Sequence, residues 1–239
     1  MKWLKLFGIT VVAICSLGIA ATSAAQAVEL KFLPEKAKFG FRSSGVVTFR
    51  TLGGKGIECE KVTGSGEGTS QRTGTIELKC VNAKDLVLGT TCTGLSDVAG
   101  SGNITVNGTY DLRHLLAPQA EDVNLAILVT SVHFSCLGIL FVVSGCVASD
   151  DLKKNVTELW LKGEKVTSFV VNFLVKAANE KGDALVTLID TDTSAGMETC
   201  ELKTKQEGGA NESSSLEGTG TVENCTVGGN ACEFVFDLK

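Results

Sequence analysis

The chain has 239 residues, of which 44% are hydrophobic and 21% are charged, and its formal net charge is −5. Its 22 Lys and Arg residues form no cluster. Because neutralising phosphate groups requires grouped basic side chains, nucleic acids and anionic membrane surfaces are excluded as favoured partners. The length suits one large β domain or two small ones.

Residues 1–27 have the organisation of a secretory signal peptide. Met1–Lys5 carries two lysines and no acid, Leu6–Ala21 is apolar, and Ala25-Gln26-Ala27 offers the small residues that a signal peptidase accepts. We expect cleavage after Ala27, with Ala24 or Ala25 as alternative sites. An uncleaved anchor is the other reading, but the apolar run is shorter than the roughly 20 residues that span a bilayer. The mature protein, residues 28–239, is therefore expected to be secreted, either to a periplasm or to the extracellular space.

From Val46 onward, short runs rich in Val, Ile, Thr and Phe alternate with Gly, Asn, Asp and Ser. This pattern predicts an all-β, antiparallel, sandwich-like fold. Residues 104–111 and 168–173 alternate apolar and polar side chains, which is typical of strands with one buried face. The only helical turn we expect lies within Leu112–Glu121.

The stretch Val123–Val147 is apolar enough to suggest a membrane span. Polar residues interrupt it, and acids flank both of its ends where Lys or Arg would mark a cytoplasmic flank. We therefore predict two central strands, at about 124–136 and 139–147, joined by a turn at Leu137-Gly138. His133 would then be a packed or hydrogen-bonded strand residue.

Two stretches of the chain follow a similar order. Each begins with Cys-Glu, at Cys59 and Cys200, continues to Thr-Gly-Thr-Ile/Val-Glu, and ends with two further cysteines. Duplication of one β-meander would give related halves at about 28–150 and 151–239. A chance product of the Thr-, Gly- and Val-rich composition explains the pattern equally well.

The chain has nine cysteines, and removal of Cys15 with the signal peptide leaves eight. An even number in an exported chain indicates disulfides. If the repeat is real, the closing pair of each half is expected to bond locally. The expected pairs are Cys80–Cys92, Cys225–Cys232, Cys59–Cys136 and Cys146–Cys200.

Several short motifs resemble a group of uncharacterised secreted bacterial proteins. They are Ile57-Glu58-Cys59, the T-G-T-I-x-L-x-C run from Thr73 to Cys80, the Gly-rich run from Cys92 to Ile104, and V-H-F-x-C from Val132 to Cys136. The resemblance extends from roughly Gly45 to Val147, where V-S-G-x-V closes it. It implies a bacterial, β-rich exported protein and brings no activity with it.

The strongest candidate for a bound ion lies between residues 190 and 201. Oxygen-bearing side chains fall at loop positions 1, 3, 5, 9 and 12, the spacing with which a calcium loop surrounds its cation; these are Asp190, Asp192, Ser194, Glu198 and Glu201. Ala195 stands where the sharp bend of such a loop requires Gly, and the flanks predict strands rather than helices. A solvated strand-to-strand turn is the alternative.

The sequence contains no G-x-S-x-G, H-E-x-x-H or phosphate-loop motif. We expect no enzyme and no cofactor other than calcium. The first expectation is a non-catalytic secreted or envelope protein, structural or binding a protein partner at the cell surface. The second is a calcium- or ligand-binding module that uses the 190–201 loop. A hydrolase with paired carboxylates from distant strands is a distant third.

Overall fold

The computed structural model describes residues 30–31, 34–115, 123–149, 152, 162–175, 186–189 and 197–238, and in these ranges the regular elements are antiparallel strands. The strands are β1 (Leu30–Lys31), β2 (Lys38–Ser43), β3 (Val47–Thr51), β4 (Gly56–Cys59), β5 (Lys61–Gly68), β6 (Thr73–Val81), β7 (Lys84–Asp85), β8 (Cys92–Gly94), β9 (Ile104–Leu115), β10 (Val123–Cys136), β11 (Ile139–Ala148), β12 (Lys162–Val166), β13 (Ser168–Val175), β14 (Val186–Ile189), β15 (Met197–Cys200), β16 (Leu202–Gln206), β17 (Asn211–Val227), β18 (Asn230–Ala231) and β19 (Phe234–Leu238). The all-β, antiparallel prediction is confirmed.

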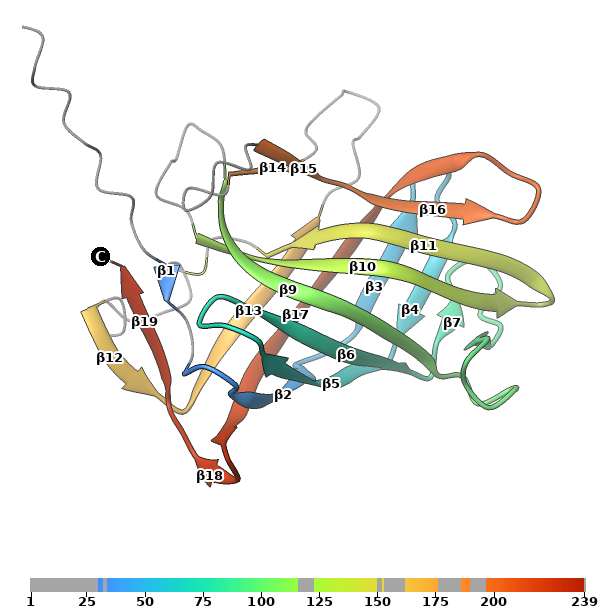
Figure 1. Ribbon diagram of the computed structural model, residues 1–239. Helices are drawn as coiled ribbons and strands as arrows, with labels where there is room; N and C mark the ends of the chain where they lie inside the picture. Colours follow the sequence, from blue (N-terminus) through green and yellow to red (C-terminus); the bar gives the residue numbers. More distant parts are fainter. Residues whose placement is uncertain are drawn as a thin grey trace, which may run out of the picture.

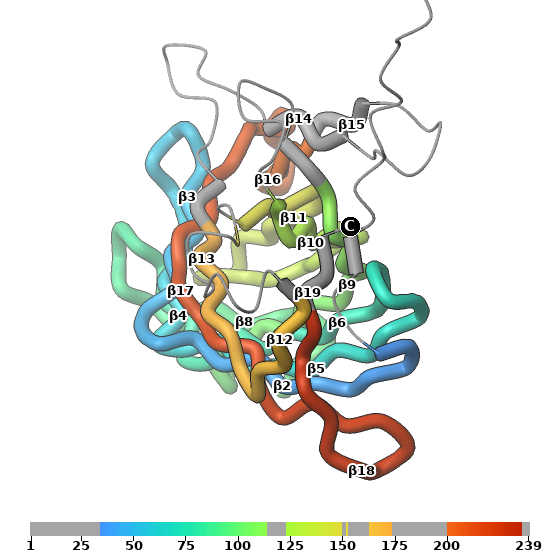
Figure 2. The backbone as a smooth tube through the Cα atoms, turned by 90° about the vertical axis from the view of Figure 1, so that its left-hand side faces the viewer, coloured from blue at the N-terminus to red at the C-terminus, as the bar shows by residue number. Residues whose placement is uncertain are grey.

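The main sheet closes on itself. Its hydrogen-bonded order runs β9-β6-β5-β2-β17-β16-β11-β10, and β10 pairs again with β9 to complete the circuit. Seen from the end that carries β12 and β19, these strands surround a common interior (Figure 2). Opposite walls of the closed sheet therefore pack against each other across one core, as the layers of a sandwich do.

Several of the eight positions, or sides, of this circuit are each occupied by two strands placed end to end. β2 and β3 both pair with the same edge of β17. In the next position, β5 pairs with β2 and β4 pairs with β3. β6 and β7, then β9 and β8, make the following two sides. The closed sheet thus has two tiers, which meet at a waist where one segment of each pair ends and the other begins (Figure 1).

The two central strands expected in the apolar stretch are present. β10 and β11 pair along their length, with Cys136 opposite Ile139 and the turn at Leu137-Gly138. The alternating segments 104–111 and 168–173 lie in β9 and β13. The expected helical turn is wrong in its first part, because β9 continues through Leu115 by pairing with β10 and β14.

Four disulfides brace the sheet, and all eight cysteines between residues 28 and 239 take part: Cys59–Cys80, Cys92–Cys136, Cys146–Cys200 and Cys225–Cys232. The last two are the expected pairs. Each bond stabilises the fold by about 2 to 4 kcal/mol, mainly by restricting the unfolded chain. Four disulfides indicate an oxidising environment outside the cytoplasm.

The expected bonds Cys80–Cys92 and Cys59–Cys136 are wrong, and strand register explains why. Cys80 lies opposite Val62 of β5, which brings it next to Cys59 at the end of β4. Cys136 lies directly opposite Cys92 where β8 pairs with β10. Pairing across neighbouring strands therefore takes precedence over nearness in sequence.

Both proposed halves contribute strands to the same closed sheet. The two Thr-Gly-Thr segments occupy different surroundings, since the one in β6 lies between β5 and β9, and the one in β17 lies between β2 and β13. The cysteines that follow them also differ, because Cys80 bonds backward to Cys59 and Cys225 bonds forward to Cys232.

Candidate functional site

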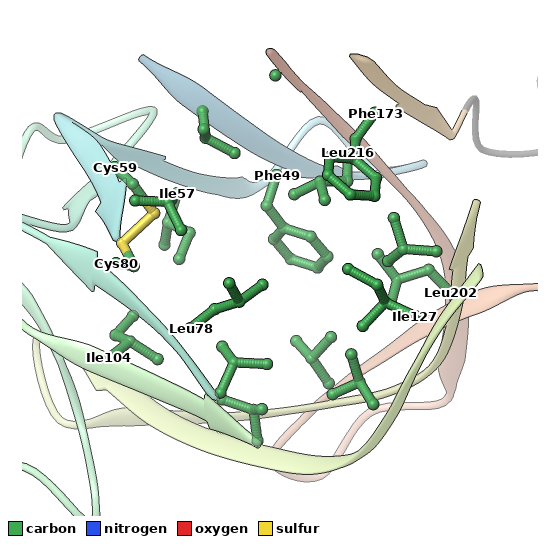
Figure 3. A pocket seen from close by; sticks show the side chains of 18 of the residues that line it. Phe49, Ile57, Cys59, Leu78, Cys80, Ile104, Ile127, Phe173, Leu202 and Leu216 are labelled. Carbon is green, nitrogen blue, oxygen red and sulfur yellow. A yellow bond between two sulfur atoms is a disulfide. The ribbon is translucent and has the colours of Figure 1, made fainter. Parts of the chain in front are cut away.

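An apolar cavity of about 130 Å³ lies inside the closed sheet at its waist. Figure 3 shows Phe49, Leu78, Ile127 and Leu202 pointing into the space from different walls. The lining comes from both tiers and from every side of the circuit. It consists of Phe41, Val47, Phe49, Ile57, Cys59, Val62, Leu78, Cys80, Ile104, Val106, Ile127, Val129, Val132, Phe134, Val143, Val147, Phe173, Leu202, Leu216, Gly218 and Thr219.

The breaks between the tiers explain why this space is not filled. Glu60 separates β4 from β5, and β10 shifts register between Val129 and Val132. Gly218 and Thr219 of β17 lie between its pairing with β3 and its pairing with β2. Such irregularities bend strands away from a regular pleat. Residues at or next to each of these three breaks line the cavity.

The chemistry of the lining favours burial of an apolar molecule. Its side chains are aliphatic, aromatic or sulfur atoms of the Cys59–Cys80 disulfide. Thr219 is the one residue among them with a hydroxyl-bearing side chain, and it is exposed. No carboxylate, amine or imidazole is among these residues. A molecule inside would be held by the hydrophobic effect and by dispersion contacts with the walls.

One end of the interior is filled by interlocking rings, which we call the aromatic end: Phe39, Phe41, Tyr110 and Phe173. Phe39 meets Tyr110 edge to face at 5.5 Å, and Phe41 meets Phe173 in the same way at 6.2 Å. Only about 10 Å³ remains between these rings and their neighbours. This end is therefore closed by well-packed aromatic side chains.

Glycines in the facing strands make room for those rings. Gly66 lies opposite Phe39 and Gly74 lies opposite Tyr110 in the strand register. A Cβ atom at either glycine would collide with the ring opposite it. The Thr-Gly-Thr sequence of β6 thus has a packing role, because its glycine backbone is the surface on which Tyr110 lies.

Tyr110 is 2% exposed, and its hydroxyl has no hydrogen-bond partner within the part of the chain that the structure describes. Burial raises the pKa of this hydroxyl well above its ordinary value near 10. The group therefore stays neutral in the folded protein at every physiological pH.

The opposite end of the interior is bordered by turns with exposed aliphatic side chains. We call this set the apolar rim; it comprises Leu52, Val87, Leu88, Leu137 and Ile139, each between 43% and 68% exposed. These residues belong to the β3–β4 turn, the segment after β7, and the β10–β11 turn together with the first residue of β11 (Figure 1, right-hand side). The two ends of the interior therefore differ in packing and in exposure.

His133 has a hydrogen-bonded role on a strand, as expected. It lies on the exposed face of β10, and its Nε2 is 2.8 Å from the hydroxyl oxygen of Ser131. Another polar group is less exposed: Asp111 of β9 accepts hydrogen bonds from Arg72 (3.2 Å) and Arg113 (2.9 Å). Neither group lines the cavity.

Most of the predicted calcium loop lies outside the described residues, namely Asp190, Asp192 and Ser194, together with the side chain of Glu198. The structure places Glu201, whose two carboxylate oxygens contact Ser213 (2.7 Å) and Lys203 (2.9 Å). The hydrogen bonds from Lys203 and then Ser213 lower the pKa of this carboxyl group. Glu201 thus has protein partners, and the calcium site stays a prediction.

Sequence patterns did not reveal the cavity. Its lining residues follow the same inward alternation as a filled core, so no motif distinguishes them. In the described ranges, no group of three or more His, Cys, Asp or Glu side chains is placed to hold a metal ion, and no helix is long and apolar enough to cross a membrane. Comparison with protein families, curated proteins and solved structures finds no match.

Proposed function

We propose that this chain is an exported, non-catalytic protein that binds a small apolar molecule inside its closed sheet. The observation that carries the proposal is the cavity at the waist, walled by apolar side chains from all sides. Closed sheets of about eight strands have interiors of the size that side chains fill or that one small ligand occupies. Here the side chains leave about 130 Å³ unfilled.

The size of the space indicates the size of the guest. A dry cavity of about 150 Å³ lined by Leu, Ile and Phe is large enough for benzene or xenon. The cavity described here has about 130 Å³ and the same kind of lining, so it suits a neutral guest with about six to eight heavy atoms. A charged guest would lose its hydration without gaining a partner.

The lining also supports a non-catalytic role. Catalysis on an enclosed molecule needs a base, a nucleophile or a paired acid within reach, and the side chains that face the cavity are hydrocarbon and disulfide sulfur. The walls therefore provide binding energy and little chemistry. In this proposal, the protein stores or transfers the guest outside the cytoplasm.

Binding is tested with xenon and toluene as probes. Toluene added to the ¹⁵N-labelled processed protein should shift backbone amides of the lining, around Val129 to Val132 and Leu216 to Thr219, with a dissociation constant of about 1 mM or tighter, equivalent to roughly −4 kcal/mol. ¹²⁹Xe should show a protein-dependent shift that toluene abolishes. Glycerol, a polar molecule of similar size, is the control. Amides that move equally with glycerol, or not at all with toluene, would refute the proposal.

The exported state has its own test. When the full chain is produced in a bacterial host, the proposal predicts a periplasmic or extracellular product that begins at Val28 and has no free thiol. Mass spectrometry before and after alkylation measures both properties. A product that keeps residues 1–27 and carries reactive thiols in the cytoplasm would contradict export.

A further inference from the structure

The two ends of the interior are not equivalent as routes for a guest. At the aromatic end, rings lie on glycine backbones and leave about 10 Å³, in a space lined only by apolar and aromatic residues. Opening that end requires several interlocked rings to move together.

The end near the apolar rim is organised differently. A second small space of about 10 Å³ lies there, between the cavity and the rim, and shares Phe49, Ile57 and Phe134 with the cavity as a common wall. Its remaining lining includes polar residues, Thr51 and Asp85. A single layer of side chains therefore separates the cavity from this space.

The lining at this end includes polar side chains, those of Thr51 and Asp85. The Thr51 side chain is buried, and its hydroxyl oxygen has no partner in the described part of the chain. Asp85 accepts hydrogen bonds from the backbone N–H groups of Val87 (2.9 Å) and Leu88 (2.8 Å), and so holds two rim residues in their turn. An unpaired buried hydroxyl costs about 1 to 3 kcal/mol. Tyr110 places one such group at the aromatic end as well, so the two ends differ instead in Asp85 and in the exposed rim side chains.

We infer that guests enter and leave the cavity through the rim end, by displacement of the Phe134 ring. Phe134 stacks on Phe141 at 5.3 Å, and both rings line the small space next to the rim. The exposed aliphatic side chains of the rim give a passing guest an apolar contact before it reaches Phe134. The Cys92–Cys136 disulfide ties the end of β10, next to the β10–β11 turn, to β8, and this limits how far that turn can move away. This inference rests on the proposed binding function.

Two phenylalanines provide a matched pair for the test. Phe134 (3% exposed) and Phe173 (7% exposed) both line the cavity, and each also borders one of the two small end spaces. Substitution by leucine enlarges the cavity in a similar way in both variants. Only Phe134→Leu removes a ring from the rim end, whereas Phe173→Leu removes one from the aromatic end.

The measurement is the exchange rate of toluene or xenon between water and protein, obtained by NMR, together with the dissociation constant. We expect Phe134→Leu to exchange the probe about tenfold faster than the unsubstituted protein, and Phe173→Leu to stay within about twofold, with similar changes in affinity in the two variants. Faster exchange in Phe173→Leu, equal acceleration in both, or no acceleration in Phe134→Leu would overturn the rim-end route.

Two disulfide variants extend the comparison. Cys92→Ser/Cys136→Ser removes a disulfide with a sequence separation of 44, and Cys136 lines the small space next to the rim. Cys146→Ser/Cys200→Ser removes a disulfide with a sequence separation of 54, and neither of its cysteines lines that space. The chain-entropy losses of the two are similar, so exchange should accelerate only in the first. Equal acceleration would show that global opening admits the guest. Absence of toluene and xenon binding in the unsubstituted protein would overturn the proposed function itself, which separates the two failures.

Discussion

Two matched valine-to-leucine substitutions test the cavity through the sign of the change in unfolding free energy. Val143 of β11 lines the cavity opposite Val132, and Val171 of β13 is fully buried outside the lining. Val143→Leu adds one methylene that can enter the void, which stabilises the fold by about 0.8 kcal/mol. Val171→Leu adds the same group where the core is filled, and overpacking costs about 1 to 3 kcal/mol.

The magnitude follows from the cavity volume. At about 24 cal/mol per Å³, a void of about 130 Å³ corresponds to roughly 3 kcal/mol of packing energy not realised, of which one methylene recovers a part. For a chain of this size, 0.8 kcal/mol raises the melting temperature by about 2 to 3 °C. Urea unfolding at constant m value measures both variants.

The refuting result is equally specific. If Val143→Leu destabilises the protein by 1 kcal/mol or more, as Val171→Leu is expected to do, the region is already filled and the binding proposal loses its basis. A stabilised Val143→Leu variant should also bind toluene more weakly, because it occupies part of the space that the guest needs.

The remaining predictions concern titration and ion binding. Tyr110 is the single tyrosine of the chain, so absorbance near 295 nm should show no tyrosinate between pH 10 and 11 in the folded protein. The free energy of unfolding should fall as pH rises above about 10, because the Tyr110 hydroxyl loses its proton at lower pH in the unfolded state than in the folded state. Glu201→Gln should reduce the free energy of unfolding at neutral pH by up to about 1 kcal/mol. Because folding lowers the pKa of the Glu201 carboxyl group below its ordinary value near 4.3, the difference between variant and unsubstituted protein should vanish as pH falls through the folded-state pKa. Calcium at about 100 times its dissociation constant should raise the free energy of unfolding by about 2.7 kcal/mol if the 190–201 loop binds it, and Asp190→Ala should abolish this gain; an unchanged melt contradicts calcium binding at that concentration.

Period-two patterning was sufficient to predict the strands with the clearest signals. The β10–β11 hairpin follows from an apolar stretch that contains a Leu-Gly turn, and the strand character of residues 104–111 and 168–173 follows from alternation. Beyond Leu112, sequence alone did not show that pairing partners extend β9, because the partners are supplied by β10 and β14.

The disulfides and the cavity depend on information that local sequence does not contain. The Cys92–Cys136 bond follows from β8 reaching the end of β10, a contact across 44 positions. The cavity depends on several strand irregularities at one level of the closed sheet. Glycines such as Gly74 carry a weak signal, since a glycine inside a strand marks a close approach, but the approaching ring of Tyr110 is not identifiable without the register.

The two-tier construction has a consequence for how the protein opens. β17, with 17 residues, is the longest of the described strands, and it pairs with β3 and β16 in one tier and with β2 and β13 in the other. β10 likewise pairs with β9 in one tier and with β8 in the other. Native-state hydrogen exchange should therefore resolve two cooperative units that share β17 and β10. Amides of β17 next to Gly218 belong to both units, and they should exchange only when the whole molecule unfolds.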